Sequence, residues 1–398
     1  MTSNRLLFLF TSFLLCSIAM RGQQHYYLGD TNRPEHQVID SSTITLDWSG
    51  EAFFTNNEYL SNLYTGYTLP GYRLSASVGY SIKALHGAKL SVGLYNLGYF
   101  GASRYPGSVA YTDVAYWSDR KHANKVHLLP IVRAEIKPTS KSIFVLGTIY
   151  GAAYHQLIAP LYNPELNLTA DPEMGVQYRY GNDRFQSDIW VNWQSFIYKI
   201  DDHQEAFTAG LSMNYNFMPQ EKSFRLSMPL QVVACHRGGE YNLTQNDTVH
   251  TWINAALGIQ AAYRTNLLGK TDLTASLYGL GYLQRGEHYP SKDGKAYYVT
   301  LGAHHKIANL ELAYFRGDGY VSPLGLPFAN CLNAQREAID QKKSSYFQIY
   351  GDIHYTFKPG LTFGFSTTFW IHPNKPYNGS SSAMEAYMSI SPSVILKK

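Results

Sequence analysis

The segment VHTWINAALGIQAAYR, residues 249–264, alternates apolar and polar side chains along its length. One face carries Ile253, Ala255, Leu257, Ile259, Ala261 and Tyr263, and the other carries Trp252, Asn254, Ala256, Gly258, Gln260 and Arg264. Successive side chains of a β-strand point to opposite sides, so this pattern predicts a strand with one apolar and one polar face. A strand of this length exceeds the five or six residues that are usual in soluble proteins.

The same alternation recurs through the rest of the chain and predicts an all-β protein of about sixteen strands, within a range of about 14–18. The predicted strands are 42–55, 69–83, 88–102, 122–137, 143–154, 169–180, 185–198, 204–218, 223–237, 249–264, 271–286, 295–307, 309–317, 345–357, 361–372 and 382–396. A β-propeller would instead show a repeat of about 40–50 residues with a blade signature, and the sequence shows none.

The links between these strands alternate in length. Short turns include 139–141, 181–184, 219–222, 308–309 and 358–360, whereas long links include 103–121, 155–168, 238–248 and 318–344. Bacterial outer-membrane barrels have short periplasmic turns and long outer loops in this alternating order. We therefore predict a transmembrane antiparallel up-and-down β-barrel with both chain ends in the periplasm. Only the link at 199–203 departs from the pattern.

The composition agrees with a barrel rather than with a helical membrane protein. Of 398 residues, 45% are hydrophobic, 16% are charged and 33 are Tyr, and the mean hydropathy is −0.25. Alternating strands average out near neutral hydropathy, and Tyr favours the membrane interface. The net charge of +4 is small and evenly spread, so no nucleic-acid partner is expected.

The N-terminus is typical of a secretory signal peptide. Arg5 is followed by the apolar stretch Leu6 to Met20, and cleavage is expected near Gly22. The alternative is an uncleaved anchor helix, for which the stretch is short. We predict a signal peptide at 1–22, a periplasmic segment at 23–41 and a barrel at 42–398. Residues 23–41 could be a tail, a plug or an added strand.

From Ser42 to Leu396 the chain resembles the Gram-negative outer-membrane β-barrels of porin type. Its Tyr- and Asn-rich strands, and the glutamines after the signal peptide, are similar to those of Bacteroidota proteins. The end Ile395-Leu396-Lys397-Lys398 departs from the aromatic residue that commonly ends a porin. The resemblance implies location in the cell outer membrane, contact with its lipids and barrel-assembly machinery, small polar solutes as cargo, and a monomer or homotrimer.

Charged residues on the predicted inner faces are candidates for lining the lumen. They include Arg73, Arg133, Glu135, Arg179, Asp188, Arg225, Arg264 and Glu311. A barrel of sixteen strands is wide enough to leave an aqueous channel unless it is plugged. These charges could line a permeation path, or they could pair across the lumen and brace the wall.

The link from Gly317 to Ser344 is the longest, and it could fold inward and constrict the outer mouth, hold a ligand or coat the surface. Asp318, Leu324 and Phe328 are the constriction candidates. The apolar Leu324 and Phe328 favour packing inside the barrel over a solvated loop. Cys235 and Cys331 could form a disulfide that pins this loop into the lumen, or could be two separate buried thiols.

Three functions are compatible with this barrel. The first is a porin-like channel or transporter for small polar solutes, and the second is a component of a secretion or surface-anchoring system. The third is a barrel-embedded lipid or peptide hydrolase, whose Ser/His or Asp/His groups would come from different strands. The chain has no Gly-x-Ser-x-Gly elbow, zincin motif or phosphate-binding glycine loop. We therefore expect no enzyme, no catalytic residue, no cofactor and no metal.

Overall fold

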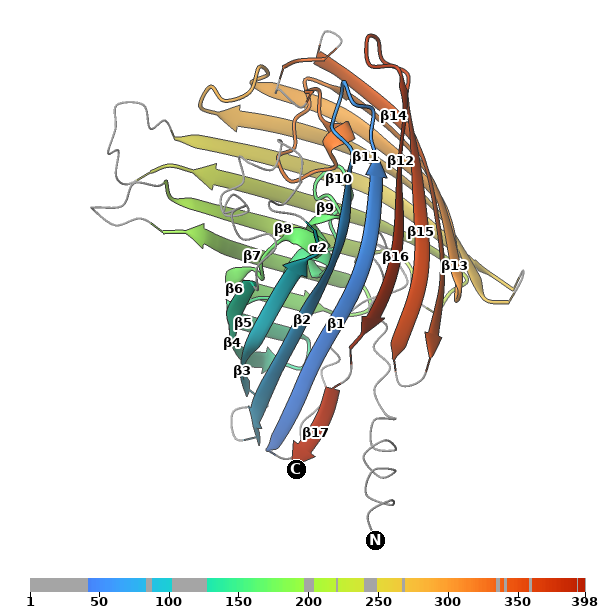
Figure 1. Ribbon diagram of the computed structural model, residues 1–398. Helices are drawn as coiled ribbons and strands as arrows, with labels where there is room; N and C mark the ends of the chain where they lie inside the picture. The colour runs from blue at the N-terminus through green and yellow to red at the C-terminus, as the bar shows by residue number, and fades with distance from the viewer. Residues whose placement is uncertain are drawn as a thin grey trace.

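The computed structural model describes residues 42–83, 88–101, 127–196, 204–219, 221–239, 249–266, 269–333, 337–339, 342–357, 360–391 and 393–397 (Figure 1). The predicted signal peptide, the segment 23–41 and the predicted link at 103–121 lie outside the described residues.

The chain forms one antiparallel sheet that closes into a barrel of the predicted up-and-down order. The strands are β1 (Thr43–Glu58), β2 (Tyr67–Ile82), β3 (Ala88–Tyr99), β4 (His127–Thr139), β5 (Ser142–Thr148), β6 (Met174–Gly181), β7 (Phe185–Ser195), β8 (Ala206–Asn216), β9 (Phe224–Arg237), β10 (His250–Thr265), β11 (Thr271–Arg285), β12 (Asp293–His305), β13 (Ala308–Asp318), β14 (Lys343–Phe357), β15 (Leu361–His372), β16 (Gly379–Ile390) and β17 (Ser393–Lys397).

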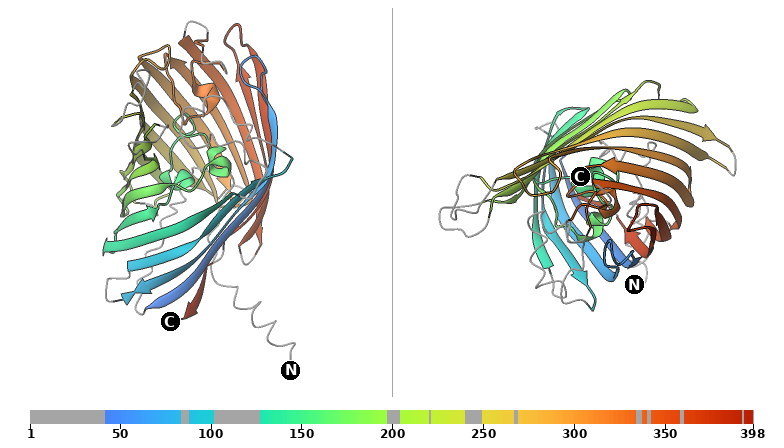
Figure 2. Two further views of the ribbon diagram at one scale, coloured as in Figure 1. Left: turned by 60° about the vertical axis from the view of Figure 1, so that its left-hand side comes forward. Right: turned by 90° about the horizontal axis from the view of Figure 1, so that it is seen from above.

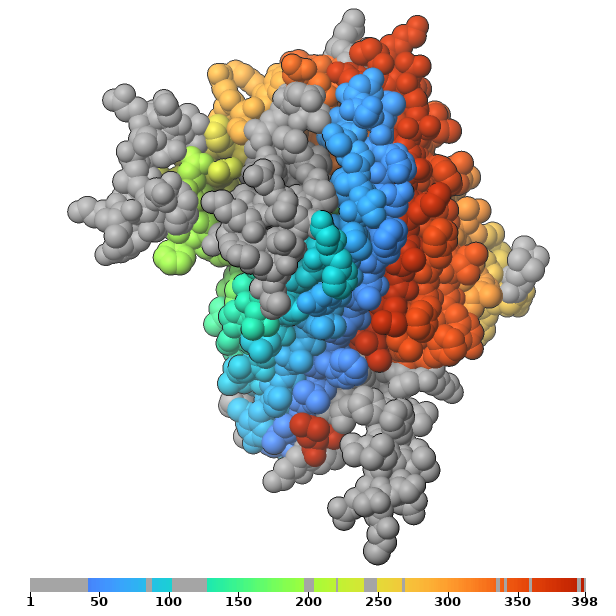
Figure 3. Space-filling model, viewed as in Figure 1, coloured from blue at the N-terminus to red at the C-terminus, as the bar shows by residue number. Residues whose placement is uncertain are grey.

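The first and last strands close the barrel. Strand β1 pairs with β2 on one side and with β16 and then β17 on the other. Gly50 lies opposite Ile390 and Asp47 lies opposite Ser393, so β16 and β17 are two parts of the sixteenth strand of the barrel. Figure 3 shows β1 directly against β16 at this seam, and the view from above in Figure 2 shows the ring. The predicted sixteen-stranded barrel is confirmed.

The outer face of the barrel carries the apolar band that a membrane requires. Leu301, Leu312, Ile349 and Phe369 lie side by side on β12 to β15, and 44–54% of each side chain is exposed. Large apolar groups held in this exposure across paired strands are stable against lipid rather than water. In the described part of the chain, no helix is long and apolar enough to cross a membrane.

The barrel wall is lower at β5 and β6, because these two strands are short. These strands have 7 and 8 residues, whereas β2 and β10 each have 16. The predicted strands 143–154 and 169–180 were therefore too long at their outer ends, because β5 ends at Thr148 and β6 begins at Met174. Among the described residues no strand lies between the end of β4 near His127 and the end of β7 near Ser195, and we call this place in the wall the step.

The segment 149–173 turns inward instead of extending the strands. It contains the short helices η4 (Ala152–His155) and α2 (Leu166–Thr169). Its apolar side chains drive it inside: Leu161 and Leu166 are fully buried, so the segment gains more from packing in the lumen than from exposure at the rim.

A second segment, residues 319–333, enters the lumen from the link between β13 and β14 and meets the first. The amide of Asn163 donates to the carbonyl of Leu324 at 2.7 Å, and the amide of Leu326 donates to the carbonyl of Ala159 at 2.8 Å. We call residues 149–173 and 319–333 together the plug. Figure 2 shows both parts inside the ring of strands.

Cys235 and Cys331 are not joined. Cys235 lies in the wall on β9, where Thr208 Oγ1 is 3.9 Å from its Sγ, and Cys331 lies in the plug, where its Sγ is 3.6 Å from Ser344 Oγ. Of the two alternatives, a disulfide or two separate buried thiols, the structure shows the second, and hydrogen bonds together with apolar packing hold the plug.

Candidate functional site

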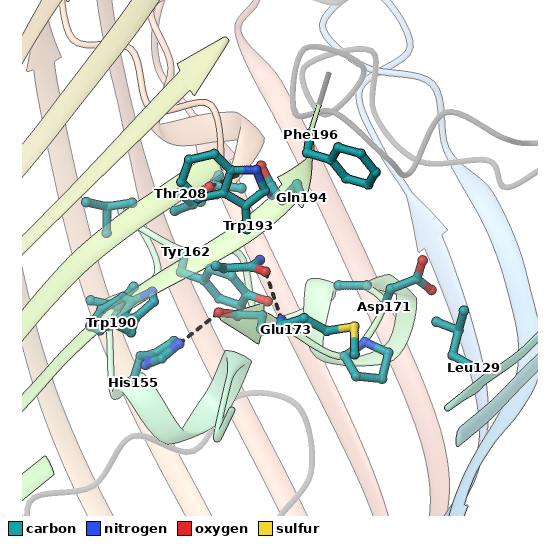
Figure 4. Close-up of a pocket in the computed structure, with 17 residues that line it drawn as sticks. Leu129, His155, Tyr162, Asp171, Glu173, Trp190, Trp193, Gln194, Phe196 and Thr208 are labelled. Carbon is teal, nitrogen blue, oxygen red and sulfur yellow. Dashed lines mark hydrogen bonds and ion pairs between the residues drawn. The ribbon is translucent and has the colours of Figure 1, made fainter. Parts of the chain in front are cut away.

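A cavity of about 310 Å³ lies between the plug and the wall, beside the step (Figure 4). Its most buried lining residues are Leu157, Tyr162 and His155 of the first plug segment, Leu324 of the second, Trp190 of β7 and Val233 of β9. Each of these side chains is at most 4% exposed. The buried lining of the cavity is therefore mainly apolar, with His155 as its charged member, and both halves of the plug help to form it.

The mouth of the cavity lies on the membrane side of the wall. Met174, Trp193 and Phe196 line it and are 38%, 46% and 73% exposed. Trp193 stacks on Phe207 at 5.0 Å between ring centroids, on the same outward face as the apolar band. In the described part of the chain, β5 and β6 end before this level of the wall.

A histidine and a carboxylate meet at this mouth. His127, the first residue of β4, places Nε2 2.6 Å from Oδ1 of Asp171, which lines the cavity from the end of the first plug segment. The side chains are 37% and 26% exposed, so solvent or a ligand can reach both. Burial raises the pKa of Asp171, and the nearby His127 opposes that shift.

A second histidine fixes the segment that carries Asp171. His155 Nδ1 lies 2.9 Å from Asp188 Oδ2 and its Nε2 lies 3.0 Å from Glu173 Oε2, while the ring stacks on Trp190 at 3.6 Å. Burial alone would lower the pKa of His155, but Glu173 and Asp188 raise it to about 9. His155 is therefore an imidazolium at neutral pH, and Figure 4 shows Glu173 between it and Asp171.

Gly151 allows the carboxylate of Glu173 to lie close to the backbone at residues 151 and 152. The amide of Ala152 donates to Glu173 Oε1 at 2.8 Å. A Cβ at Gly151 would lie 2.6 Å from Cδ of Glu173, so a larger residue there would displace the carboxylate. The segment around Glu173 is thus held by a charge pair and a backbone hydrogen bond, two residues from Asp171.

The two histidines differ in what they can do chemically. Both ring nitrogens of His155 donate to carboxylates, so it serves as a fixed cation. His127 has one nitrogen on Asp171, which is the arrangement in which a carboxylate orients a histidine that takes up a proton. The His127–Asp171 pair is therefore the candidate general base.

A serine–histidine pair elsewhere in the barrel is less suited to catalysis. His372 Nε2 lies 3.0 Å from Ser381 Oγ, which also accepts a hydrogen bond from the Leu60 amide at 3.0 Å. Ser381 is 2% exposed, and the ring of Phe328 covers His372 at 4.6 Å. Neither residue lines the cavity, so we assign the pair to packing of the plug against β15 and β16.

The predicted lumen residues lie on inner faces, where most of them make polar contacts. Arg73 pairs with Glu51 at 2.6 Å, and Asp272 lies 3.1 Å from Arg225 and 2.9 Å from Arg264. The hydroxyl of Tyr150 donates to Glu135 at 2.5 Å. The guanidinium groups of Arg133 and Arg179 lie 4.1 and 5.6 Å from the centroid of the Tyr150 ring. Asp188 pairs with His155. Glu311 lies on the inner face of β13.

The three constriction candidates differ in position and burial. Leu324 and Phe328 are buried in the plug at 4% and 3% exposure, whereas Asp318 ends β13 with an exposed side chain. Their effect on permeation stays a prediction.

Sequence reasoning missed His127, His155, Asp171 and Glu173. The available signal was the apolar content of the link at 155–168, which is as unusual for a solvated loop as that of 318–344.

Solved structures share the fold of this chain. The loop L8 deletion mutant of OmpT, an outer-membrane protein of Vibrio cholerae, has a TM-score of 0.50 at 10% identity, covering 88% of this chain and 100% of that one. OmpT in its trimer form has a TM-score of 0.48 at 10% identity, covering 88% and 99%. OccAB3 of Acinetobacter baumannii has a TM-score of 0.44 at 12% identity, covering 89% and 100%. The likeness to the L8 deletion mutant shows the barrel fold, while a homotrimer of this chain stays a prediction.

The sequence comparisons give a more specific result. No curated protein sequence matches the chain. A family model described as lipid A 3'-O-deacylase-type matches residues 34–398. This match contradicts the expectation that the chain is not an enzyme. The expectation was wrong because it rested on short linear motifs, and the histidine and carboxylate of the candidate site lie 44 residues apart in the chain.

Proposed function

Because the chain belongs to the lipid A 3'-O-deacylase-type family, we propose that it is an outer-membrane hydrolase that removes an ester-linked acyl chain from a membrane glycolipid. One observation carries the proposal: the His127–Asp171 pair lies at a mainly apolar cavity beside the step, which the exposed Met174, Trp193 and Phe196 also line. This places a general base where an acyl chain would leave the membrane.

The proposed reaction uses water as the nucleophile. Asp171 accepts a hydrogen bond from Nε2–H of His127, which leaves Nδ1 of the ring to take a proton from water. The oxygen of that water attacks the acyl carbonyl carbon and the ester C–O bond breaks. His127 then returns the proton to the departing sugar oxygen, so the products are a free fatty acid and an alcohol.

The packed lumen favours hydrolysis over a porin-like channel. Leu157, Leu161, Tyr320, Leu326 and Phe328 of the plug form one apolar core with wall residues. Water and ions pass poorly through a core packed at protein density. A lipid reaches the cavity sideways through the step and does not need an open lumen.

The proposal is tested by measuring acyl release from lipopolysaccharide in proteoliposomes by mass spectrometry. His127→Gln and Asp171→Asn should each lower the rate, by about 10²–10⁴-fold for loss of a general base at His127. His354→Gln is the matched control, because His354 also lies 2.6 Å from an aspartate, Asp352, but outside the cavity.

Two outcomes would count against the proposal. Release at the wild-type rate by folded His127→Gln and Asp171→Asn proteins would remove the pair from the reaction. A wild-type protein that releases no fatty acid but shows stepwise conductance in planar bilayers would favour the channel.

A further inference from the structure

We propose that the cavity measures acyl-chain length and that Val233 at its buried end sets the longest chain accepted. This inference rests on the proposed hydrolase and adds the residue that determines its specificity. The lining of the cavity includes the partly exposed Asp171 and the buried apolar side chains of Val233, Leu157 and Leu324.

The polarity of the cavity orients an acyl chain in one direction. Asp171 and its partner His127 lie at the mouth, where the ester carbonyl would react. Val233 and Leu157 are 3% and 1% exposed, and their side chains offer a terminal methyl group apolar contacts. At about 310 Å³ the cavity is at the lower limit of ligand sites, which suits one chain rather than a whole lipid.

The buried end is held on several sides, which a length gauge requires. Val233 lies within β9, where it pairs with Gly210 of β8 and Asn254 of β10. The carbonyl of Leu324 accepts from the Asn163 amide at 2.7 Å. Beside Leu157, the side chain of Gln231 donates to the Gln156 carbonyl at 2.8 Å and accepts from the Ile158 amide at 2.9 Å.

Substitutions at Val233 should move the preferred chain length in opposite directions. Val233→Phe should shift the optimum to shorter chains and Val233→Ala to longer ones. Each methylene that Val233→Phe pushes out of the cavity should cost about 4-fold in affinity. Val232→Phe is the matched control, because Val232 is the neighbouring residue on the outward face of β9.

Two readouts separate this inference from the proposed function. The first is the hydrolysis rate for a homologous series of saturated p-nitrophenyl esters. The second needs no turnover: fatty acids brominated at the terminal carbon should quench Trp190, which lines the cavity, and Trp190→Phe identifies its share of the signal.

Parallel shifts in the rate and in the quenching of the Val233 variants, with Val232→Phe unchanged, would support the inference. An unchanged length profile in both Val233→Phe and Val233→Ala, or a drop of equal size at every length, would overturn it. If quenching follows the length of the chain and moves with Val233 while no ester is hydrolysed, the gauge stands and the hydrolase proposal fails.

Discussion

Raising the pH should release the first plug segment from the wall, because the charge on His155 holds the two together. The imidazolium lies between Glu173 of the plug and Asp188 of β7, and its pKa is about 9 against an ordinary value of 6.5. A raised pKa in the folded state stabilises that state fully below the ordinary pKa, and this stabilisation is lost as the pH rises through the folded-state pKa.

The size of the effect follows from these two pKa values. At about pH 7.5 the charge contributes about 2 kcal/mol to docking of the segment, and at about pH 10 it contributes almost nothing. The equilibrium constant for local opening should therefore rise about 30-fold between these conditions. His155 is 2% exposed, so solvent screens the pair little.

Hydrogen exchange measures this opening directly. Peptides covering 149–173 should lose protection between the two pH values, after correction for the intrinsic exchange rate, while peptides from β10 keep theirs. His155→Gln should lower protection at neutral pH and abolish the pH dependence, and His354→Gln should do neither. Equal protection of 149–173 at both pH values in the wild type would refute the assignment of His155 as the charged clamp.

Two other features of the plug can be tested in the same preparation. Leu161→Ala removes a fully buried side chain and should cost about 2–5 kcal/mol of plug stability, seen as faster exchange in 149–173, whereas Leu310→Ala on the lipid face should not change that segment. Burial raises the pKa of the Cys331 thiol to about 11, so a maleimide should label Cys331 only after denaturation without reductant, and recovery of a Cys235–Cys331 cross-linked peptide would contradict the structure.

Much of the barrel could be predicted because each strand obeys a local rule. In residues 250–265 and 271–285 every second side chain meets lipid, and the side chains between them meet polar groups. The sequence alone therefore predicts which side chains point outward and which point inward. The alternation of short and long links adds the strand order. Neither rule needs knowledge of residues far away in the chain.

The same rules failed at 149–173, where the competing interaction is long-range. Alternation near 143–154 suggested a strand, but packing of Leu161 and Leu166 against residues 319–333 favours an inward turn. The candidate site depends on that turn, since it brings Asp171 to His127 and Glu173 to His155. A pattern that looks only at neighbouring residues could not reveal either pair.

The low wall at β5 and β6 also has a consequence for the bilayer itself. A transmembrane β-strand needs about 9–11 residues to cross the hydrocarbon layer, and these two strands have 7 and 8. Lipids relieve such hydrophobic mismatch by thinning around the short side of a protein. The bilayer beside this protein should therefore thin at the step, which brings the ester groups of its lipids toward His127 and Asp171.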